Sequence, residues 1–433
     1  MIINYSELLK KLNNTKIPKS FNLSKSKDGN PCLRACSDNE GENRVNIYIS
    51  SRYNPENEAK QFAGKNYSDS ENIFIYGLGL GYHIKALYEL LQENQKLYIL
   101  ECSMPLVKTA FENTDIKNTL NEKNIIFCAT DNQTDAIMFA KKSLSKNCSF
   151  ILHEPSLKLM PERIPVKELF ESYLIRSKTL NKFSELMEEN NKYNSSLNLK
   201  SGVDFFKSIV YNKPSIIVSA GPSLSLSIEK LRSVEKKAYI LAVLRSANVL
   251  KNAGIRPDCY IVTDAKISSY QQLKYADTSV PLILLSTANK NVTLYSGEKY
   301  IIYEKHAAYK LQKNNYAVET GGSVATTALS LSVLSGANPN ILLGQDLCYW
   351  SDLRHAGEKS GYSYVKTNKY VKGINGETYY TTLNLYEYLR WFGRFAAKNK
   401  DKNILNATEK GADIDNIAHI DLVDTLINYP NIK

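Results

Sequence analysis

The strongest constraint on the fold is an apolar run that breaks sharply into a turn and then into a helix-like segment. The run Pro214–Val218 is rich in β-branched residues, which suits a buried strand. In the turn Ala220–Ser223, Gly221 allows close backbone approach, and Pro222 and Ser223 suit the start of a helix. Backbone N–H groups at a helix start are unpaired and carry the positive end of the dipole, so this turn is suited to a phosphate. A purely structural turn would use the same residues, and both interpretations stay open here.

A second strand-turn-helix pattern occurs earlier in the chain. Gly77, Gly79 and Gly81 separate a predicted strand from a predicted helix, and Glu101 closes the next predicted strand 24 residues after Gly77. This spacing is typical of a Rossmann nucleotide or S-adenosylmethionine pocket, in which the acid accepts hydrogen bonds from ribose hydroxyls. The pattern predicts either a second nucleotide site or a turn that has kept its shape without a ligand.

Alternating strand and helix signals predict an α/β protein with two Rossmann-like units and a mostly parallel sheet in the second. Strands are expected at residues 73–76, 96–100, 125–129, 149–153, 214–218, 238–243, 259–263, 281–285 and 339–343. We expect an N-terminal cap at 1–65 with a strand at 44–50, a Rossmann-like domain at 66–199, an α/β ligand-binding domain at 200–360 and a C-terminal extension or lid at 361–433. A helical segment over 165–198 is expected to link the units, with the boundary near Lys200. The extension is expected to hold a hairpin at 371–380 and an amphipathic helix at 384–398.

Composition limits the classes of function. The mean hydropathy is −0.34, and no run approaches the roughly 20 apolar residues of a membrane-spanning helix, so we expect a soluble cytoplasmic protein without membrane insertion. The net charge of +11 comes from lysines spread along the chain, which permits nucleic-acid binding without indicating it; an anionic small substrate or an acidic protein partner explains the charge equally well. Seven scattered cysteines favour reduced thiols, and no metal site is expected at the close pair Cys32 and Cys36.

Polar and small residues gather at predicted strand ends and turns in the second half of the chain. These residues are Asp264, Thr320, Gly322, Ser323, Gly344, Asp346 and His355. In open α/β sheets, ligands bind beyond the carboxyl ends of the strands. A helix start after Ser323 again offers unpaired N–H groups, and an imidazole on a polar loop such as His355 suits general base catalysis.

The same segments, in the same order, resemble the motility-associated-factor (Maf) flagellin glycosyltransferases across roughly residues 70 to 412. The motifs are Ser219–Leu224, Gly254–Asp258 with Thr263-Asp264, Gly321–Ala325, Gly344–Leu347, His355-Ala356 and Asn406–Ala412. The Gly77–Glu101 segment resembles that family's own Rossmann-like N-terminal domain, which disfavours an independent methyltransferase. The second unit is similar to 6-hydroxymethylpterin diphosphokinase-like (MptE-like) domains and, more distantly, to bacterial sialyltransferases, and the resemblance implies a sialyltransferase-like (GT-A-type) domain.

The resemblance implies an inverting, metal-independent transfer without a cofactor. A nonulosonic acid, pseudaminic or legionaminic, would pass from a cytidine monophosphate (CMP) donor to serine or threonine of flagellin. The residues implied to line the CMP site are Gly221, Pro222, Ser223, Asp264, Thr320, Gly322, Ser323 and Gly344. Asp346 would orient the site, and His355 would be the general base. The sialyltransferases place an asparagine where this chain has Ser246-Ala247, which leaves the contacts to the nucleotide base unassigned.

Two other functions fit the same motifs. A 6-hydroxymethylpterin diphosphokinase would need ATP and Mg²⁺, with Asp258, Asp264 and Asp346 as metal ligands. A flagellin chaperone or scaffold would keep the fold and bind flagellin without catalysis. The oligomeric state is not predicted by any of these patterns.

Overall fold

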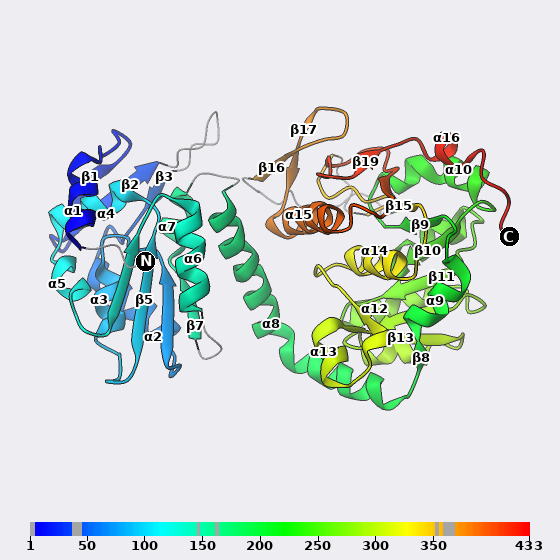
Figure 1. Cartoon of the computed structure of the whole chain (residues 1–433), viewed down its shortest axis with the longest axis horizontal. Helices are drawn as coiled ribbons and strands as arrows, with labels where there is room; N and C mark the ends of the chain where they lie inside the picture. The colour runs from blue at the N-terminus through cyan, green and yellow to red at the C-terminus, as the bar shows by residue number, and fades with distance from the viewer. Residues whose placement is uncertain (1–4, 37–45, 145–147, 161–163, 351–354, 358–368) are drawn as a thin grey trace. The chain divides into compact units, whose positions relative to one another are not determined.

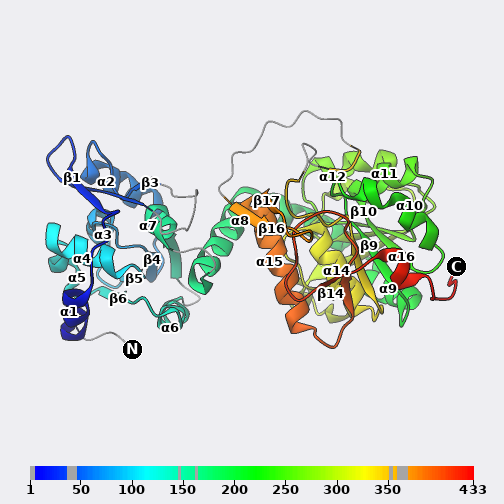
Figure 2. The same ribbon diagram turned by 90° about the horizontal axis from the view of Figure 1, so that it is seen from above.

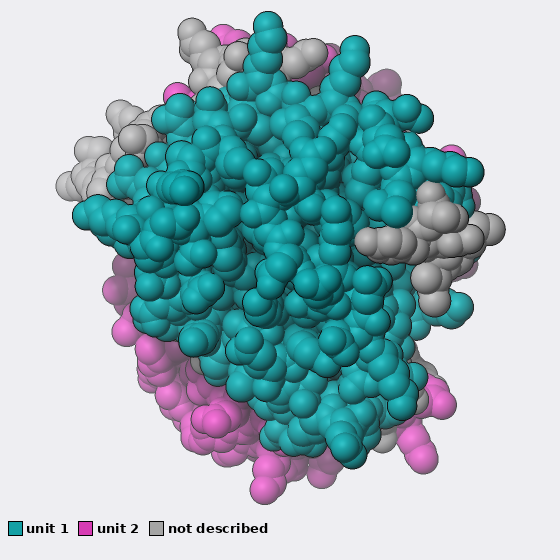
Figure 3. Space-filling view, turned by 90° about the vertical axis from the view of Figure 1, so that its left-hand side faces the viewer, with its two compact units in different colours: residues 1–176 teal, residues 177–433 magenta. Residues whose placement is uncertain are grey.

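The computed structural model describes residues 5–36, 46–144, 148–160, 164–350, 355–357 and 369–433. Its elements can be followed along the chain in Figure 1 and from above in Figure 2. Contacts divide the chain into two compact units, residues 1–176 and 177–433, which Figure 3 distinguishes by colour. The division lies inside the long helix α8 (Pro165–Ser196), whereas the sequence placed the boundary near Lys200 at the end of that helix.

The first unit contains a four-stranded parallel sheet in the order β6-β5-β4-β7. The strands are β4 (Asn72–Tyr76), β5 (Lys96–Glu101), β6 (Ile125–Ala129) and β7 (Cys148–Leu152). Along β4, Ile73 and Ile75 pack into one apolar cluster, and Phe74 and Tyr76 pack into another on the opposite face. Both faces are therefore buried, as expected for a parallel sheet, and the predicted Rossmann-like unit is confirmed.

Helices cover this sheet, and a small antiparallel sheet precedes it. The helices are α1 (Tyr5–Asn14), α2 (Pro55–Asn66), α3 (Tyr82–Tyr88), α4 (Met104–Asn113), α5 (Ile116–Leu120), α6 (Gln133–Ser143) and α7 (Glu154–Leu159), and the small sheet contains β1 (Asn22–Lys25), β2 (Pro31–Cys36) and β3 (Asn46–Tyr48). The sequence predicted β3 but missed β1 and β2. Leu33 and Ala35 on β2 are fully buried in the same cluster as Ile73, so the predicted cap contributes to the core of the unit.

The second unit is built on a ten-stranded sheet in which all recorded strand pairs are parallel. Its order is β14-β13-β12-β11-β10-β9-β15-β18-β19, with β8 paired to β13. The strands are β8 (Lys200–Ser201), β9 (Ser215–Val218), β10 (Tyr239–Val243), β11 (Cys259–Val262), β12 (Leu282–Leu285), β13 (Lys299–Glu304), β14 (Ala317–Val318), β15 (Asn340–Leu343), β18 (Ile404–Asn406) and β19 (Ala418–His419). The five strands predicted here are confirmed, and the other five were missed.

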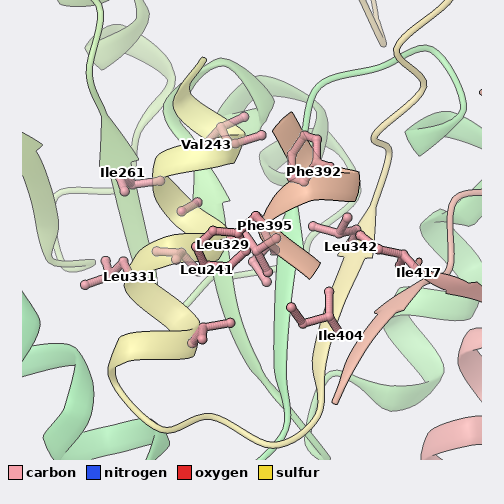
Figure 4. Close-up of a cluster of buried hydrophobic side chains, with 14 of the residues drawn as sticks. Leu241, Val243, Ile261, Leu329, Leu331, Leu342, Phe392, Phe395, Ile404 and Ile417 are labelled. Atoms are coloured by element: carbon pink, nitrogen blue, oxygen red, sulfur yellow. The ribbon is translucent and has the colours of Figure 1, made fainter. Parts of the chain in front are cut away.

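The two faces of the large sheet carry separate apolar clusters under different helices (Figure 2). One face lies under α9 (Gly202–Val210), α14 (Val324–Leu334) and α15 (Leu383–Lys398), and the other under α10 (Leu224–Val234), α11 (Ala247–Asn252) and α16 (Leu422–Leu426). Figure 4 shows the first cluster, in which Leu329 of α14 and Phe392 of α15 pack with Leu241 and Leu342 of the sheet.

The C-terminal segment completes the second unit. The predicted hairpin is confirmed as β16 (Lys369–Lys372) and β17 (Thr378–Thr381), and the predicted amphipathic helix is α15. Further short elements are α12 (Ile267–Gln271), α13 (Lys305–Lys310) and the 3₁₀ turns η1 (Leu244–Ser246), η2 (Gln272–Tyr275), η3 (Lys290–Leu294) and η4 (Asn314–Tyr316). Since β18 and β19 extend the main sheet, this segment is part of the α/β core of the second unit.

The strand order creates a reversal beside β9. From β9 the chain proceeds outward through β10 to β14, and it then returns to place β15 on the other side of β9. In parallel sheets, such a reversal opens a crevice beyond the carboxyl ends of the two strands where the direction changes. The loops that follow β9 and β15 meet at this crevice.

Two asparagines near the end of α8 hold the loops that follow β11 and β12. Asn190 and Asn194 are fully buried. The Asn194 Nδ2 donates to the carbonyls of Ser286 and Ala288 at 2.9 and 2.8 Å. The Asn190 Nδ2 donates to the carbonyl of Ala265 at 3.2 Å. The last turns of α8 therefore position the loop that carries Asp264.

Of the helices in the described ranges, none is both long enough and apolar enough to cross a bilayer.

Candidate functional site

A cavity of about 460 Å³ lies at the carboxyl ends of β9, β10, β11 and β15, which is within the usual range of about 300–1,000 Å³ for ligand pockets. Its lining includes the following residues that the sequence singled out: Gly221, Pro222, Asp264, Ser323, Gly344, Asp346 and His355. Three other predicted residues, Ser223, Thr320 and Gly322, are not in the lining. The strand reversal thus brings together residues that are up to 134 positions apart in the sequence.

Two glycines let the loops after β9 and β15 pack directly against each other. The Gly221 N–H donates to the Gly344 carbonyl at 2.9 Å. A Cβ on Gly221 would lie 2.5 Å from the Gly344 oxygen and would overlap the Asp346 carboxylate. Gly344 has a φ of +68°, and a Cβ there would lie 2.8 Å from the Ser219 oxygen. Neither position accepts a side chain without displacing the other loop.

Asp346 is buried at the point where the two loops meet. Its carboxylate accepts hydrogen bonds from the Ser223 N–H at 2.9 Å, the Ser223 Oγ at 2.5 Å and the Trp350 Nε1 at 2.6 Å. Burial raises the pKa of Asp346 to about 6, although these hydrogen bonds act to lower it. Three donors from two segments therefore converge on one carboxylate, which fixes the geometry of the crevice.

The position of Asp346 changes the interpretation of the turn after β9. The carboxylate lies at the start of α10, where the sequence analysis placed a phosphate, and it takes the Ser223 N–H. Ser223 is fully buried, and the Gly221 N–H already has an acceptor in Gly344. The predicted phosphate contact of Ser223 is therefore corrected: this serine binds Asp346. Sequence alone does not show which anion occupies a helix start when the carboxylate is 123 residues away.

The start of α14 remains suited to an anion. Ser323 caps the helix, and its Oγ accepts from the Thr326 N–H at 3.3 Å. Val324 and Ala325 line the cavity, and among the residues that the structure describes their N–H groups have no acceptor. Thr320 and Gly322 lie in the turn just before the helix. Because α14 runs for 11 residues, its start carries the full positive end of a helix dipole.

His355 and Arg245 add titratable and cationic groups to the cavity. The Ala356 N–H donates to the Ala220 carbonyl at 3.0 Å, which holds His355 beside the turn after β9. Arg245 lies in η1, directly after β10, and its side chain is exposed. Arg245 belongs to none of the predicted motifs, although its place just after the predicted strand 238–243 is a signal for a residue at the ligand-binding edge of the sheet.

Two tyrosines also line the cavity. Tyr349 and Tyr388 line the cavity with the polar side chain of Gln345. Burial and the nearby charge of Asp264 raise the pKa of Tyr388, so its hydroxyl stays protonated. The Gln345 Oε1 accepts from the Ser219 Oγ at 2.7 Å, which orients that amide.

The glycine turn of the first unit is filled by the protein's own side chains. Glu101 is fully buried, and its carboxylate accepts from the N–H groups of Leu78 and Ser103, both at 2.9 Å. The rings of His83 and His153 stack with centroids 4.0 Å apart beside Gly79. The predicted contact between Glu101 and a ribose is therefore corrected, because the carboxylate points into the loop. Gly77, Gly79 and Gly81 all have positive φ and form this turn.

Glu101 gives a testable dependence of stability on pH. Burial raises the pKa of Glu101 to about 7, so the folded state binds a proton that the unfolded state releases above its ordinary pKa of 4.5. Protonation of Glu101 therefore stabilises the folded state by on the order of 3 kcal/mol. This stabilisation is fully present below pH 4.5 and is lost as the pH rises to 7. We expect the unfolding free energy of the wild type minus that of Glu101→Gln to fall across this range, as measured by circular dichroism in denaturant. A constant difference would contradict the assignment.

The geometry does not bring together the metal ligands that a pterin diphosphokinase was expected to use. Asp258 precedes β11, so it lies at the amino end of the sheet, where its carboxylate accepts from the Ile240 N–H at 2.7 Å and pairs with Lys433 at 2.5 Å. Asp264 and Asp346 line the cavity at the carboxyl end. This ligand set is therefore corrected, because the three carboxylates cannot share one ion. The described part of the chain holds no cluster of three or more His, Cys, Asp or Glu side chains arranged for a metal.

Comparisons with known proteins agree with this architecture. Residues 185–352 match the family model described as 6-hydroxymethylpterin diphosphokinase MptE-like. The whole fold is similar to the solved structure of the Maf glycosyltransferase from Magnetospirillum magneticum AMB-1, with a TM-score of 0.50 and 16% identity over 96% of this chain and 72% of that chain. A search of curated proteins by sequence found no match. Residues 185–352 are therefore similar to MptE-like domains, in a chain whose fold is similar to that of a Maf glycosyltransferase.

Proposed function

We propose that this chain is a glycosyltransferase that moves a nonulosonic acid from a CMP-activated donor to serine or threonine of flagellin, with inversion and without a metal. The observation that carries the proposal is the cavity at the strand reversal, which brings a helix start suited to phosphate beside an imidazole suited to deprotonate an acceptor. The fold shared with a Maf glycosyltransferase and the motifs in this sequence support the same activity.

The residues take distinct roles in binding CMP. The phosphate lies at the start of α14, where the N–H groups of Val324 and Ala325 and the Ser323 hydroxyl stabilise its charge as the sugar departs. Thr320 and Gly322 shape the turn before that helix. Gly221, Pro222, Gly344 and Asp264 line the same cavity. Ser223 acts through Asp346, which is a positioning residue.

The reaction is a single displacement. The bond between the anomeric carbon and the phosphate oxygen breaks, and its electrons leave with CMP through an oxocarbenium-like transition state. The acceptor hydroxyl oxygen forms the new bond from the opposite face, and His355 takes the proton of that hydroxyl. Attack on the face opposite the leaving group inverts the anomeric centre.

Ligand binding separates this function from its enzymatic rival. The match of residues 185–352 to an MptE-like family favours a 6-hydroxymethylpterin diphosphokinase as the second candidate. We expect isothermal calorimetry of the full chain to detect CMP binding in the absence of divalent metal. Binding of magnesium–ATP together with no binding of CMP would contradict the transferase and support the diphosphokinase.

The identity of flagellin as the acceptor protein can be tested in cells. In a strain that lacks this protein, we expect mass spectrometry to show flagellin reduced by the mass of the nonulosonic acid at each modified residue. An unchanged glycan mass would contradict the proposal. Stable binding of flagellin by the purified chain, without CMP binding or sugar transfer, would instead support a chaperone or scaffold.

A further inference from the structure

We infer that Gln345 is a further catalytic residue, whose side-chain amide donates a hydrogen bond to the phosphate oxygen that leaves with CMP. The inference rests on the proposed function, and it adds a donor that stabilises the departing group. It starts from the side chain of Gln345, which is only 8% exposed and lines the cavity just after β15.

Two separate segments fix the position of Gln345. Its backbone N–H donates to the Thr408 Oγ1 at 3.0 Å, and its side-chain Oε1 accepts from the Ser219 Oγ at 2.7 Å. Ser219 is itself buried, and its backbone N–H donates to the Leu343 carbonyl at 2.8 Å. The main chain and the amide oxygen of Gln345 are therefore held before a ligand arrives. A donor fixed in this way needs little reorganisation during a reaction.

The amide nitrogen of Gln345 is a donor that the protein itself leaves unused. Among the residues that the structure describes, no group accepts a hydrogen bond from this Nε2. The Nε2 is also not one of the fully enclosed polar atoms without a partner in that part of the chain, so it is open to the cavity. A ligand that displaces water from the cavity must then supply an acceptor, because a buried donor without one is costly.

The turn after β9 holds both Gln345 and the proposed base. Ser219 binds the Gln345 side chain, and the next residue, Ala220, accepts from the Ala356 N–H at 3.0 Å, which holds His355 beside the same turn. A general base must lie near the reacting atoms. The amide of Gln345 is therefore expected at the reacting end of the donor, where the leaving phosphate oxygen and the sugar carboxylate are the available acceptors.

Of these two acceptors, the phosphate oxygen is the one whose charge grows during the reaction. As its bond to the anomeric carbon breaks, the electron pair stays on this oxygen, and the phosphate passes from one negative charge to about two. The sugar carboxylate keeps the same charge throughout. A fixed N–H donor that faces the leaving oxygen therefore stabilises the transition state more than the bound donor sugar. Gln345 transfers no proton in this step, and the start of α14 binds the other oxygens of the phosphate.

The first test removes the donor and compares CMP with cytidine, which lacks the phosphate. In Gln345→Met, which keeps the length of the side chain, we expect the Kd of CMP to rise about 10- to 100-fold in calorimetry, as for a lost hydrogen bond to a charged group. The Kd of cytidine should stay within about twofold. The kcat of sugar transfer to flagellin should fall about 10²- to 10³-fold, the range for loss of one donor to a developing charge.

Three other variants separate the role of the amide from packing. Gln345→Glu keeps an acceptor for the Ser219 hydroxyl but presents an oxygen in place of the N–H, so it should lose at least as much activity as Gln345→Met. Ser219→Ala leaves the amide without its anchor, and we expect kcat to fall about 2- to 10-fold. Gln271→Met is the matched control, because this exposed glutamine of α12 lies outside the lining, and it should change neither kcat nor Kd.

The remaining outcomes separate this inference from the proposed function. Near-normal kcat and CMP affinity in Gln345→Met would overturn the inference, and so would full activity of Gln345→Glu. Weaker binding of CMP-pseudaminic acid with unchanged CMP binding would place the amide at the carboxylate, and an equal loss for cytidine would place it at the nucleoside; either result overturns the inference. In all these cases the wild type still binds CMP, whereas a wild type that binds no CMP contradicts the proposed function itself.

Folding of the variants is checked by tryptophan fluorescence in denaturant. If Gln345→Met does not unfold cooperatively, Ser219→Ala decides, and an unchanged kcat in that variant would overturn the inference.

Discussion

Replacing His355 with alanine is expected to lower the rate of sugar transfer by about 10²- to 10⁴-fold, the range typical of a lost general base. His355 lines the cavity, and the hydrogen bond from Ala356 to Ala220 holds it beside the turn after β9. Without an imidazole, the acceptor hydroxyl must lose its proton to water. The measurement is kcat with flagellin and a CMP-activated donor, with the Kd of CMP from calorimetry. The affinity for CMP should stay within about twofold, because the phosphate subsite that we propose is at the start of α14.

A second variant at this position separates proton transfer from packing. His355→Asn keeps a polar side chain of intermediate size but has no basic nitrogen, so we expect it to lose activity as severely as His355→Ala. Near-normal transfer by either variant would remove the role of His355 as base. If only the alanine variant lost activity, the imidazole would act through its volume.

Replacing Asp346 with alanine is expected to lower the unfolding free energy by about 3–5 kcal/mol, the usual effect of removing one partner from a buried charged network. The change leaves the Ser223 N–H and hydroxyl and the Trp350 N–H without their acceptor. The two tryptophans of the chain, Trp350 and Trp391, are both in the second unit, so their fluorescence in denaturant reports the unfolding of that unit. We also expect CMP affinity to fall, because the loops after β9 and β15 lose the carboxylate that joins them.

Asp264→Ala is the matched control for this prediction. Asp264 is a carboxylate of the same cavity but is exposed, and its described side-chain hydrogen bond is to the Lys266 N–H. We expect its loss to change the unfolding free energy by less than about 1 kcal/mol. Equal and small effects of the two substitutions would show that Asp346 does not hold the loops together.

The strand pattern of the second unit could be predicted because most of its central strands are apolar on both faces. Runs such as 214–218 and 281–285 are therefore continuous in the sequence and bounded by proline. The missed strands have weaker signals. β13 begins and ends with charged residues, and β18 and β19 are only three and two residues long. Their pairing depends on neighbours that a local pattern does not contain.

The candidate site could be predicted in position but not in its hydrogen bonding. Glycine turns and polar strand ends pointed to the cavity, because parallel strands place their carboxyl ends at one edge. Which groups are free to bind a ligand depends on contacts between distant segments. Ser223 is taken by Asp346, and Glu101 turns into its own loop. Arg245 lies in no recognisable motif, and only the packing around η1 shows that it reaches the cavity.

The buried asparagines of α8 determine where this protein can be divided by genetic truncation. A second unit produced alone from Lys200 would lack Asn190 and Asn194, so the carbonyls of Ala265, Ser286 and Ala288 would lose the amide donors that hold their loops. The Asp264 loop would then be free to drift from the cavity. A fragment that begins at Ser177 keeps both asparagines, so the loops at the cavity retain these donors.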